Sequence, residues 1–461
     1  MSAAPSISSE PELQAWTQFF DRASAMMSGE VQDLVRTQAS PTDLREQLEL
    51  GLPSSPRPLP EVVDALFELV EEAPSTASPR FFNQLFGGRT AAASMGEMLS
   101  VLLNNSMYTF KAAGVHALIE RTLSQRMCSL SGFTDGEGSF TPGGSLSNLL
   151  AVILARGEQF EDSREHGFGT VRPILYTSKL GHYSIPKNAG MAGIGRSNVR
   201  YVATDARGRM LPDDLERQIN EDRALGHTPF FINATAGTTV LGAFDPLVEL
   251  SRIATAAGIW LHVDGALGGS MLLSEQTRPL LDGLEHADSF TWDAHKMMGV
   301  PLTCSVLLVR QPGILGRQLS EKADYLFHGD DMHDRGQTSM QCGRRNDALK
   351  LWAAWQALGD SGLSNRIDDA VGSARHAAQR IEQTPGLTLA KQPESVNVVF
   401  QREGVDSKVL CAALQKQGLA VVGSATVEGE TVVRLSCVNS NIEPGDIDAF
   451  VEAAATVVIP N

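Results

Sequence analysis

The sequence is poor in cysteine and lacks any long apolar run. Its 461 residues include five cysteines, which are scattered and never in C-x-x-C spacing. This pattern excludes a disulfide framework and a cysteine-based zinc site, and it is typical of reduced thiols. No stretch reaches the roughly 18 uninterrupted apolar residues of a membrane span, and the N-terminus has no basic segment followed by an apolar run. We therefore expect a cytoplasmic protein without a membrane partner.

Basic residues are also in deficit. Lys and Arg number 38 against 54 Asp and Glu, which gives a net charge of −16. Such a surface repels a phosphate backbone and excludes non-specific nucleic-acid binding. An anionic small-molecule substrate would need individually placed arginines or lysines. Histidines and aspartates do gather at 328–334, but their spacing fits no closed metal site, so we expect a solvated loop and no bound metal.

Three segments with different patterns divide the chain. We expect residues 1–90 to form a helical N-terminal segment, residues 91–365 a large α/β domain, and residues 366–461 a small α+β domain. Strands are expected at 172–177, 198–203, 230–234, 259–264, 289–292 and 305–309, and in the small domain at 396–400, 420–422 and 432–436. Helical stretches alternate with the first set, and repeated β–α units predict a mostly parallel sheet covered on both faces.

Two of these strands deliver ionisable residues at their carboxyl ends. Asp264 ends the strand at 259–264, and Lys296 follows the strand at 289–292, directly after His295. Carboxyl ends of parallel strands share one edge of a sheet, where the active sites of α/β proteins lie. A pyridoxal phosphate (PLP) site needs a lysine that forms a Schiff base and an acid that pairs with the pyridine nitrogen. The sequence therefore predicts a PLP-dependent enzyme that acts at an amino-acid carbon.

Three further motifs suit the same site. Gly143-Gly144-Ser145 precedes an apolar helix, whose N-terminus can hold a phosphate through its free N–H groups and the helix dipole. His182 follows a strand end and can stack on a flat cofactor, and Thr235 offers a hydroxyl at another strand end. Taken singly, an ordinary turn or loop explains each motif at least as well.

In combination these motifs resemble the group II PLP-dependent amino-acid decarboxylases, which include glutamate decarboxylase and cysteine sulfinate decarboxylase. The matching segments run in family order at 79–85 (PRFFNQL), 141–145 (TPGGS), 181–184 (GHYS), 236–239 (AGTT), 262–264 (HVD), 295–296 (HK) and 341–345 (QCGRR). The resemblance implies the type I fold of PLP enzymes, which is aspartate aminotransferase-like: a large α/β domain with a mostly parallel sheet, and a small C-terminal α+β domain. It also implies a homodimer with shared active sites.

The resemblance assigns cofactor roles residue by residue. Lys296 would carry PLP as a Schiff base, and Asp264 would keep the pyridine nitrogen protonated, an ion pair that a dry site strengthens. His182 would stack over the ring and take part in catalysis. The remaining contacts would come from Ala266 on the other face of the ring, from Gly144 and Ser145 at the phosphate, from Thr235 and His295, and from Gly343, which would reach the phosphate of the partner subunit.

Four residues bear on the amino-acid substrate. Arg434 matches an arginine that grips a substrate anion, and Gln84 matches a side chain that helps to hold the distal acid. Ser106 and Tyr108 stand where glutamate decarboxylases have Asn-x-Phe, and Ser-x-Tyr resembles the cysteine sulfinate decarboxylases. We therefore expect α-decarboxylation of a short acidic L-amino acid: cysteine sulfinate, cysteate or aspartate, giving hypotaurine, taurine or β-alanine. Glutamate and 2,4-diaminobutyrate stay open as alternatives.

The catalytic loop departs from the family pattern. It falls at 324–340, where a tyrosine is expected to protonate Cα, and no tyrosine follows Tyr325. His333 is our candidate for that role, with His328 as second choice. Related PLP enzymes use the same fold for aldehyde synthesis or transamination, so those reactions stay open. A non-catalytic PLP-binding protein also stays open, although the intact set of cofactor residues disfavours it.

Overall fold

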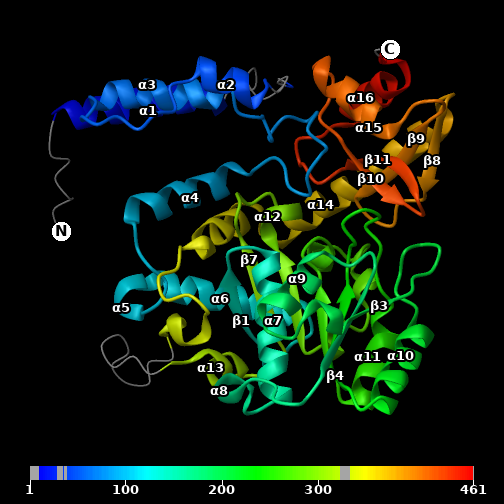
Figure 1. The fold of residues 1–461 in the computed structure, drawn as a ribbon. Helices are drawn as coiled ribbons and strands as arrows, with labels where there is room; N and C mark the ends of the chain where they lie inside the picture. Colours follow the sequence, from blue (N-terminus) through cyan, green and yellow to red (C-terminus); the bar gives the residue numbers. More distant parts are fainter. Residues whose placement is uncertain (1–9, 28–34, 36–38, 322–332, 460–461) are drawn as a thin grey trace.

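The computed structural model describes residues 10–27, 35, 39–321 and 333–459 (Figure 1). A seven-stranded sheet forms the centre of the molecule, and a four-stranded sheet lies beside it. The expected combination of a mostly parallel α/β sheet with a small α+β unit is confirmed. The division at residues 90 and 365 stays a prediction, and one helix, α14 (Asp347–Gln383), crosses the second boundary with a non-helical Gly359 (φ 62°) inside it.

The central sheet has the order β1-β7-β6-β5-β4-β2-β3. Its strands are β1 (Glu137–Thr141), β2 (Pro173–Ser178), β3 (Val199–Val202), β4 (Thr228–Thr235), β5 (Trp260–Asp264), β6 (Ser289–Asp293) and β7 (Ser305–Val309). β7 runs antiparallel to β1 and β6, whereas β6, β5, β4, β2 and β3 are parallel to one another. The register pairs Thr235 with Asp264 and Asp264 with Thr291, so these side chains meet at one edge of the sheet.

Helices cover both faces of the central sheet. They are α6 (Val115–Leu130), α7 (Gly144–Gln159), α8 (Ser163–His166), α9 (Ser184–Met191), α10 (Pro212–Ala224), α11 (Leu247–Ala257), α12 (Ala294–Met297) and α13 (Ile314–Leu319). Residues of α7, α9 and α13 share one buried cluster, and residues of α6, α10, α11 and α14 share another. Alternate residues of β2 and β7 enter the two clusters, for example Ile174 and Leu175 of β2, so both faces of these strands are apolar.

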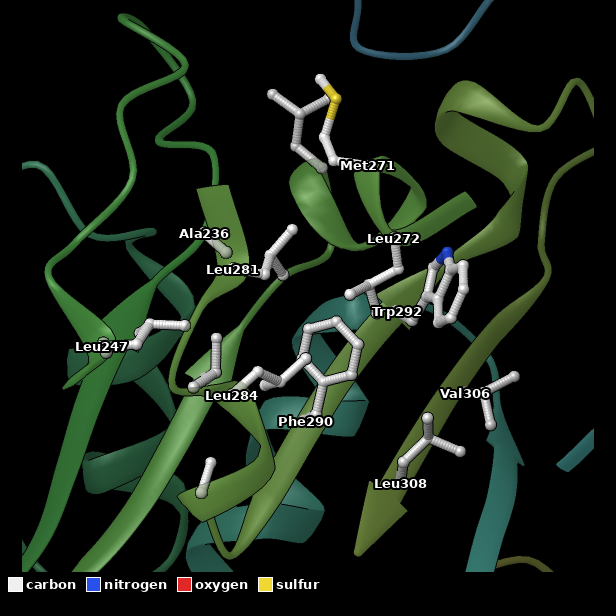
Figure 2. Close-up of a cluster of buried hydrophobic side chains, with 14 of the residues drawn as sticks. Ala236, Leu247, Met271, Leu272, Leu281, Leu284, Phe290, Trp292, Val306 and Leu308 are labelled. Carbon is white, nitrogen blue, oxygen red and sulfur yellow. The ribbon is translucent and has the colours of Figure 1, made fainter. Parts of the chain in front are cut away.

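Strand β6 shows the alternation that positions the site. Phe290 and Trp292 point into the larger cluster, among side chains such as Leu272 and Leu284 (Figure 2). Because successive side chains of a strand face opposite ways, Thr291 and Asp293 point toward α7. The rule that buries the aromatic residues therefore places polar residues on the side where α7 begins.

The small sheet has the antiparallel order β10-β11-β9-β8. Its elements are β8 (Leu387–Lys391), β9 (Asn397–Arg402), α15 (Ser407–Lys416), β10 (Gly423–Val427), β11 (Glu430–Ser436) and α16 (Pro444–Thr456). Phe82, from far upstream, lies in its core with a ring centroid 5.0 Å from that of Phe450. The predicted strand at 420–422 is wrong, because Val421 forms only an isolated bridge with Phe81.

The N-terminal part consists of short helices: α1 (Glu10–Met27), α2 (Pro41–Gln47), α3 (Leu59–Glu71), α4 (Ala91–Leu103) and α5 (Phe110–Ala113). α1 and α3 pack against each other, with Phe19 and Arg22 both against the ring of Phe67. α4 packs on α14 at the edge of the main body (Figure 1). Among the described helices, none is long and apolar enough to span a bilayer.

Candidate active site

A cavity of about 470 Å³ opens at the carboxyl edge of the central sheet. Its lining residues are Gln84, Leu85, Phe86, Gly144, Ser145, Asn148, His182, Tyr183, Thr235, Gly237, Thr239, Asp264, Ala266, Leu267, Asp293, His295, Lys296 and Arg434. They come from the ends of β4, β5 and β6, from the start of α7, and from segments attached to the small sheet. Most of the residues predicted for the site are thus brought together.

Asp264 is held by a chain of hydrogen bonds that runs through α7. Its carboxylate accepts from Asn148 Nδ2 at 2.8 Å and from the Ala266 N–H at 3.2 Å. The Oδ1 atom of Asn148 lies 3.0 Å from His262 Nε2 and accepts from Thr291 at 2.9 Å. Burial lowers the pKa of His262 to about 4, so this imidazole is neutral and donates from Nε2 to Asn148. The chain fixes Asp264 as an oriented acceptor at the cavity floor.

Lys296 lies on α12, directly after β6, with 19% of its side chain exposed. Its Nζ is 3.6 Å from Asp293 Oδ2, and His295 Nε2 is 3.5 Å from the same oxygen. Burial lowers the pKa of His295, although Asp293 opposes the shift. Lys296 thus places an amine in the cavity wall, with the buried Asp293 carboxyl group beside it.

His182 sits where the chain leaves β2. Its Nδ1 lies 2.8 Å from Ser184 Oγ, which also accepts from Asn148 Nδ2 at 3.1 Å. Burial lowers the pKa of His182, although Asp264 opposes the shift. In the neutral ring Nδ1 accepts from Ser184, so Nε2 carries the proton. The ring of His182 is thereby oriented by the same asparagine that holds Asp264.

The N-terminus of α7 forms part of the cavity wall. The helix begins at Gly144, and the first turn of a helix leaves its N–H groups without partners in the helix. A Cβ at Gly144 would lie 2.7 Å from Asp293 Oδ2 and 3.2 Å from the Cβ of Ala266. Only glycine fits this close approach, which leaves the backbone N–H groups accessible to an anion.

Thr235 ends β4 with a polar group that lacks a partner. Its buried Oγ1 has no hydrogen-bond partner within the described residues. Its N–H donates to Asp245 Oδ2 at 2.7 Å, and Asp245 Oδ1 accepts from the Met210 N–H at 2.6 Å. A buried hydroxyl without a partner in a cavity wall is expected to bind a polar atom of a ligand.

Arg434 brings a cation from β11 to the cavity. Its guanidinium donates to backbone carbonyls, those of Thr239 at 3.2 Å and of Asn83. No carboxylate of the described residues lies within ion-pair distance of it, and its buried Nε has no hydrogen-bond partner there. Burial lowers the pKa of Arg434. A half-buried cation without a counter-ion favours an anionic ligand.

Comparisons with known proteins agree with this geometry. The sequence profile of the pyridoxal-dependent decarboxylase conserved domain matches residues 41–403. The chain belongs to this family. Human cysteine sulfinic acid decarboxylase is 43% identical over 366 residues, which are 78% of this chain and 74% of that relative. The mouse acidic amino acid decarboxylase GADL1 is 41% identical over 366 residues, 78% of this chain and 66% of that relative. Mouse CSAD in its apo form superposes with a TM-score of 0.91 at 36% identity, over 96% of this chain and 97% of that one.

The chain is therefore a PLP-dependent amino-acid decarboxylase, and PLP is its cofactor. The cavity fits this group by the chemistry of its walls. An amine, an oriented carboxylate and a glycine-bounded helix N-terminus match the aldehyde, the pyridine nitrogen and the phosphate of PLP. The unpartnered Oγ1 of Thr235 leaves room for one more polar contact.

Four predicted residues do not line the cavity. Ser106 Oγ accepts from the Arg344 N–H at 3.1 Å, and the carbonyl of Tyr108 accepts from the Gly336 N–H at 2.7 Å. The ring of His333 packs on Phe110, with centroids 5.5 Å apart. Gly343 lies in the segment just before α14, and the second-choice His328 falls outside the described residues. The roles of these residues stay predictions.

Asn148 and Asp293 are among the residues of the cavity wall that were not predicted from the sequence. Asn148 stands one helical turn after Gly144, so the motif that predicted a phosphate cradle also contained the partner of Asp264. Asp293 stands three residues before Lys296, where strand periodicity predicts that it faces α7. The sequence positions of both residues were informative. Their roles follow, however, only once the helix and the strand are known to lie side by side.

Proposed function

We propose that the chain removes the α-carboxylate of a short acidic L-amino acid: cysteine sulfinate, cysteate or aspartate. The observation that carries this proposal is Arg434, a guanidinium in the cavity wall without a carboxylate partner among the described residues. A planar guanidinium binds a carboxylate or sulfinate through two parallel hydrogen bonds. Two relatives named for acidic substrates, cysteine sulfinic acid decarboxylase and acidic amino acid decarboxylase, support the same substrate class.

The residues of the cavity divide the work of catalysis. When bound, PLP supplies an electron sink for the pair released from the Cα–carboxylate bond. Lys296 anchors the cofactor, and Asp264 holds a proton on the pyridine nitrogen. His182 covers the ring, and Arg434 with Gln84 holds the substrate's distal acid so that the scissile bond keeps one orientation. Orientation of the reacting bond is the main contribution of the chain itself.

We further propose a homodimer in the cytoplasm. α4 exposes a row of apolar side chains, namely Met95, Leu99, Val101, Leu102 and Leu103. A patch of this kind on a helix is typical of a protein interface. Gly343 lies outside the cavity of its own chain, which is compatible with a contact to the phosphate site of the partner. All five cysteines are free, as in proteins of reducing compartments.

The substrate proposal is tested by CO₂ release from a panel of L-amino acids: cysteine sulfinate, cysteate, aspartate, glutamate and 2,4-diaminobutyrate. We expect kcat/KM to be at least about tenfold higher for one of the first three, because the wrong length leaves a buried polar group unpaired. We also expect one amine per CO₂ and no ammonia. Lys296→Ala is the blank. A preference for glutamate or diaminobutyrate, or release of aldehyde and ammonia, would contradict the proposal.

A further inference from the structure

Asp293 is a buried carboxyl group at the point where the cavity meets α7. It ends β6, is 2% exposed, and lies on the face of the strand opposite the aromatic residues of the core in Figure 2. Its Oδ2 would be 2.7 Å and its Oδ1 3.1 Å from a Cβ placed on Gly144. The carboxyl group therefore lies against the first residue of α7, whose N–H groups are proposed to hold the cofactor phosphate.

A chain of hydroxyl groups points toward Asp293. Ser305 Oγ donates to Asp293 Oδ1, Ser147 Oγ lies 2.9 Å from Ser305 Oγ, and Thr141 Oγ1 lies 2.6 Å from Ser147 Oγ. An ionised carboxylate only accepts, so Ser305 donates to it and each hydroxyl behind Ser305 can donate in the same direction. The three hydroxyl groups are thus arranged so that each can donate toward the Asp293 carboxyl group.

Two basic side chains lie next to the Asp293 carboxyl group. Lys296 and His295 of α12 approach Oδ2 at 3.6 and 3.5 Å. Burial lowers the pKa of His295, which disfavours its cationic form. Asp264 from β5 and His182 line the same cavity, and burial likewise lowers the pKa of His182.

Among the residues that the structure describes, no further cation reaches Asp293 from behind β7. Within the described residues, its ion pairs are those with Lys296 and His295. Lys350 of α14 lies behind Cys304, but it pairs with Glu97 and Asp347 at 2.9 Å each. Cys304 stays a neutral thiol, because burial raises its pKa well above the ordinary value. Within the described residues, Lys296 is thus the one Lys or Arg side chain within ion-pair distance of the Asp293 carboxyl group.

We propose that Asp293 couples binding of PLP to uptake of a proton. A phosphate with two negative charges at the start of α7 faces the carboxylate across a short, dry gap, and two anions that share a site retain an extra proton between them. The proton comes from a solvent or buffer acid, whose bond to it breaks as an O–H bond forms on the Asp293 carboxyl or a phosphate oxygen; no bond between heavy atoms changes in this step. The inference rests on the proposed placement of the phosphate at Gly144, and it does not depend on which amino acid is the substrate.

The sign of the pH dependence follows from this coupling. A complex that binds one proton more than its separated parts weakens as pH rises, by up to about tenfold per pH unit. The second pKa of a phosphate monoester is about 6, so below that pH the phosphate brings its own proton and the effect fades. Asp293→Asn keeps the shape of the side chain and an acceptor for Ser305 but removes the charge. It should therefore bind PLP about tenfold more tightly than wild type at pH 8 and nearly equally at pH 6.

The test is calorimetric titration of PLP into the apo-protein in buffers of different ionisation enthalpy, which counts the protons taken up. At pH 8 we expect wild type to take up about 0.5–1 proton more than Asp293→Asn. Pyridoxal, which has the aldehyde but no phosphate, is the matched ligand, and with it the two proteins should take up equal numbers of protons. Ser305→Ala, which keeps Asp293 but removes a donor to its ionised form, should move the loss of affinity to higher pH.

Two results would overturn the coupling. One is equal proton uptake by wild type and Asp293→Asn on binding PLP. The other is a difference that persists with pyridoxal, which would assign the proton to Lys296 rather than to the phosphate. Reduction with borohydride and mapping of the adduct to position 296 reports separately on the proposed cofactor site. If wild type forms this adduct, but wild type and Asp293→Asn take up equal numbers of protons, the proposed cofactor site stands and the proton coupling is wrong.

Discussion

Charged side chains of the cavity differ in whether the chain itself supplies a partner. Asp264 receives hydrogen bonds from Asn148 and from a backbone N–H, and Asp293 receives one from Ser305. In the described part of the chain, Arg434 donates only to neutral carbonyl oxygens. A buried carboxylate that accepts hydrogen bonds from the chain is held in one orientation. A guanidinium whose N–H groups are not all hydrogen-bonded can instead bind an anionic ligand in the cavity. The residue contacts therefore separate the cofactor end of the site from the substrate end.

Replacement of Arg434 should act on substrate binding rather than on the cofactor. Loss of one partner of a buried charge pair costs about 2–5 kcal/mol, so Arg434→Gln should lower kcat/KM for the acidic substrate by about 30-fold to 1000-fold or more. Arg434→Lys keeps the charge but not the planar pair of N–H donors, so its kcat/KM should lie between those of wild type and Arg434→Gln. Steady-state CO₂ release and the absorbance of bound PLP measure the two effects separately.

The matched control for Arg434 is Arg402, which also donates to backbone carbonyls, those of Ala454 and Val457, but lies outside the cavity wall. Arg402→Gln should leave KM unchanged. Should Arg434→Gln lose PLP while its KM for the remaining activity stays that of wild type, the assignment of Arg434 to the substrate would be wrong.

The sequence pattern predicted those site residues whose role follows from their position within a single strand or helix. Lys296 and Asp264 were found because each stands at the end of an apolar strand, and Gly144 because it opens a helix. Asn148 was missed because its role depends on α7 crossing β5, a tertiary contact that no periodicity encodes. Ser106 and Tyr108 came from a resemblance alone, and in the single chain they contact the segment before α14 instead of the cavity.

The end of β4 is positioned by a carboxylate outside the cavity. Asp245 accepts from the N–H groups of Thr235 and Met210, and thus ties the cavity wall to the turn that precedes α10. Burial raises the pKa of Asp245 to about 7, and the charges of Asp205 and Glu394 act in the same direction. One element of the site therefore depends on a group that titrates near neutral pH.

This group should make stability depend on pH. Because the folded state binds the proton of Asp245 more tightly than the unfolded chain does, the free energy of unfolding falls as pH rises from about 4 to about 7 and then levels off, by up to about 4 kcal/mol. Asp245→Asn resembles the protonated form, since its amide also offers a single acceptor to two N–H groups. In this variant the decline should be smaller, as measured by the apparent midpoint of thermal unfolding between pH 4.5 and 8.

Asp213→Asn, at an exposed position on α10, serves as the control for charge removal and should keep the wild-type profile. An Asp245→Asn profile that still falls with the wild-type slope would show that another group titrates in this range.

Most elements of the central sheet were predictable, because apolar runs between turn residues identify buried strands. The prediction of 305–309 coincides with β7, but its antiparallel direction did not follow from the pattern, which is the same for either direction. β1 was missed because Glu137–Thr141 contains one aromatic residue and no branched aliphatic residue. The error at 420–422 has a related cause: Val421 bridges Phe81, and Val422 is buried in the cluster that contains Phe82, both from more than 300 residues upstream.

The cavity is a product of the whole molecule. The central-sheet side provides Lys296 and Asp264, and β11 of the small sheet provides Arg434. The segment around Gln84 is attached to the small-sheet side, because Phe82 exchanges backbone hydrogen bonds with Val421 and Ser436. Parts that far apart in sequence share a site only when the two sheets keep a fixed relation. On α4, Ala93, Gly96 and Ser100 pack inward, whereas Met95 and Leu102 of the exposed row lie on the other side of the helix.

Disruption of the α4 row should separate the proposed dimer. Leu99 and Leu102 are 51% and 56% exposed and lie three residues apart, on one face of the helix. In Leu99→Glu/Leu102→Glu, two carboxylates in an apolar interface would be desolvated without partners, so the species seen by light scattering should fall from twice the chain mass to the chain mass of 49.5 kDa. The monomer should keep its far-UV circular dichroism, because neither side chain supports the chain's own core.

If Gly343 of one chain completes the phosphate site of the other, the monomer should also bind PLP more weakly. Val248→Glu, on α11 at 54% exposure, introduces the same charge elsewhere and should remain a dimer with wild-type affinity for PLP. A double variant that keeps the wild-type mass would place the interface elsewhere, and a dissociated variant that binds PLP as wild type does would show that each chain completes its own site.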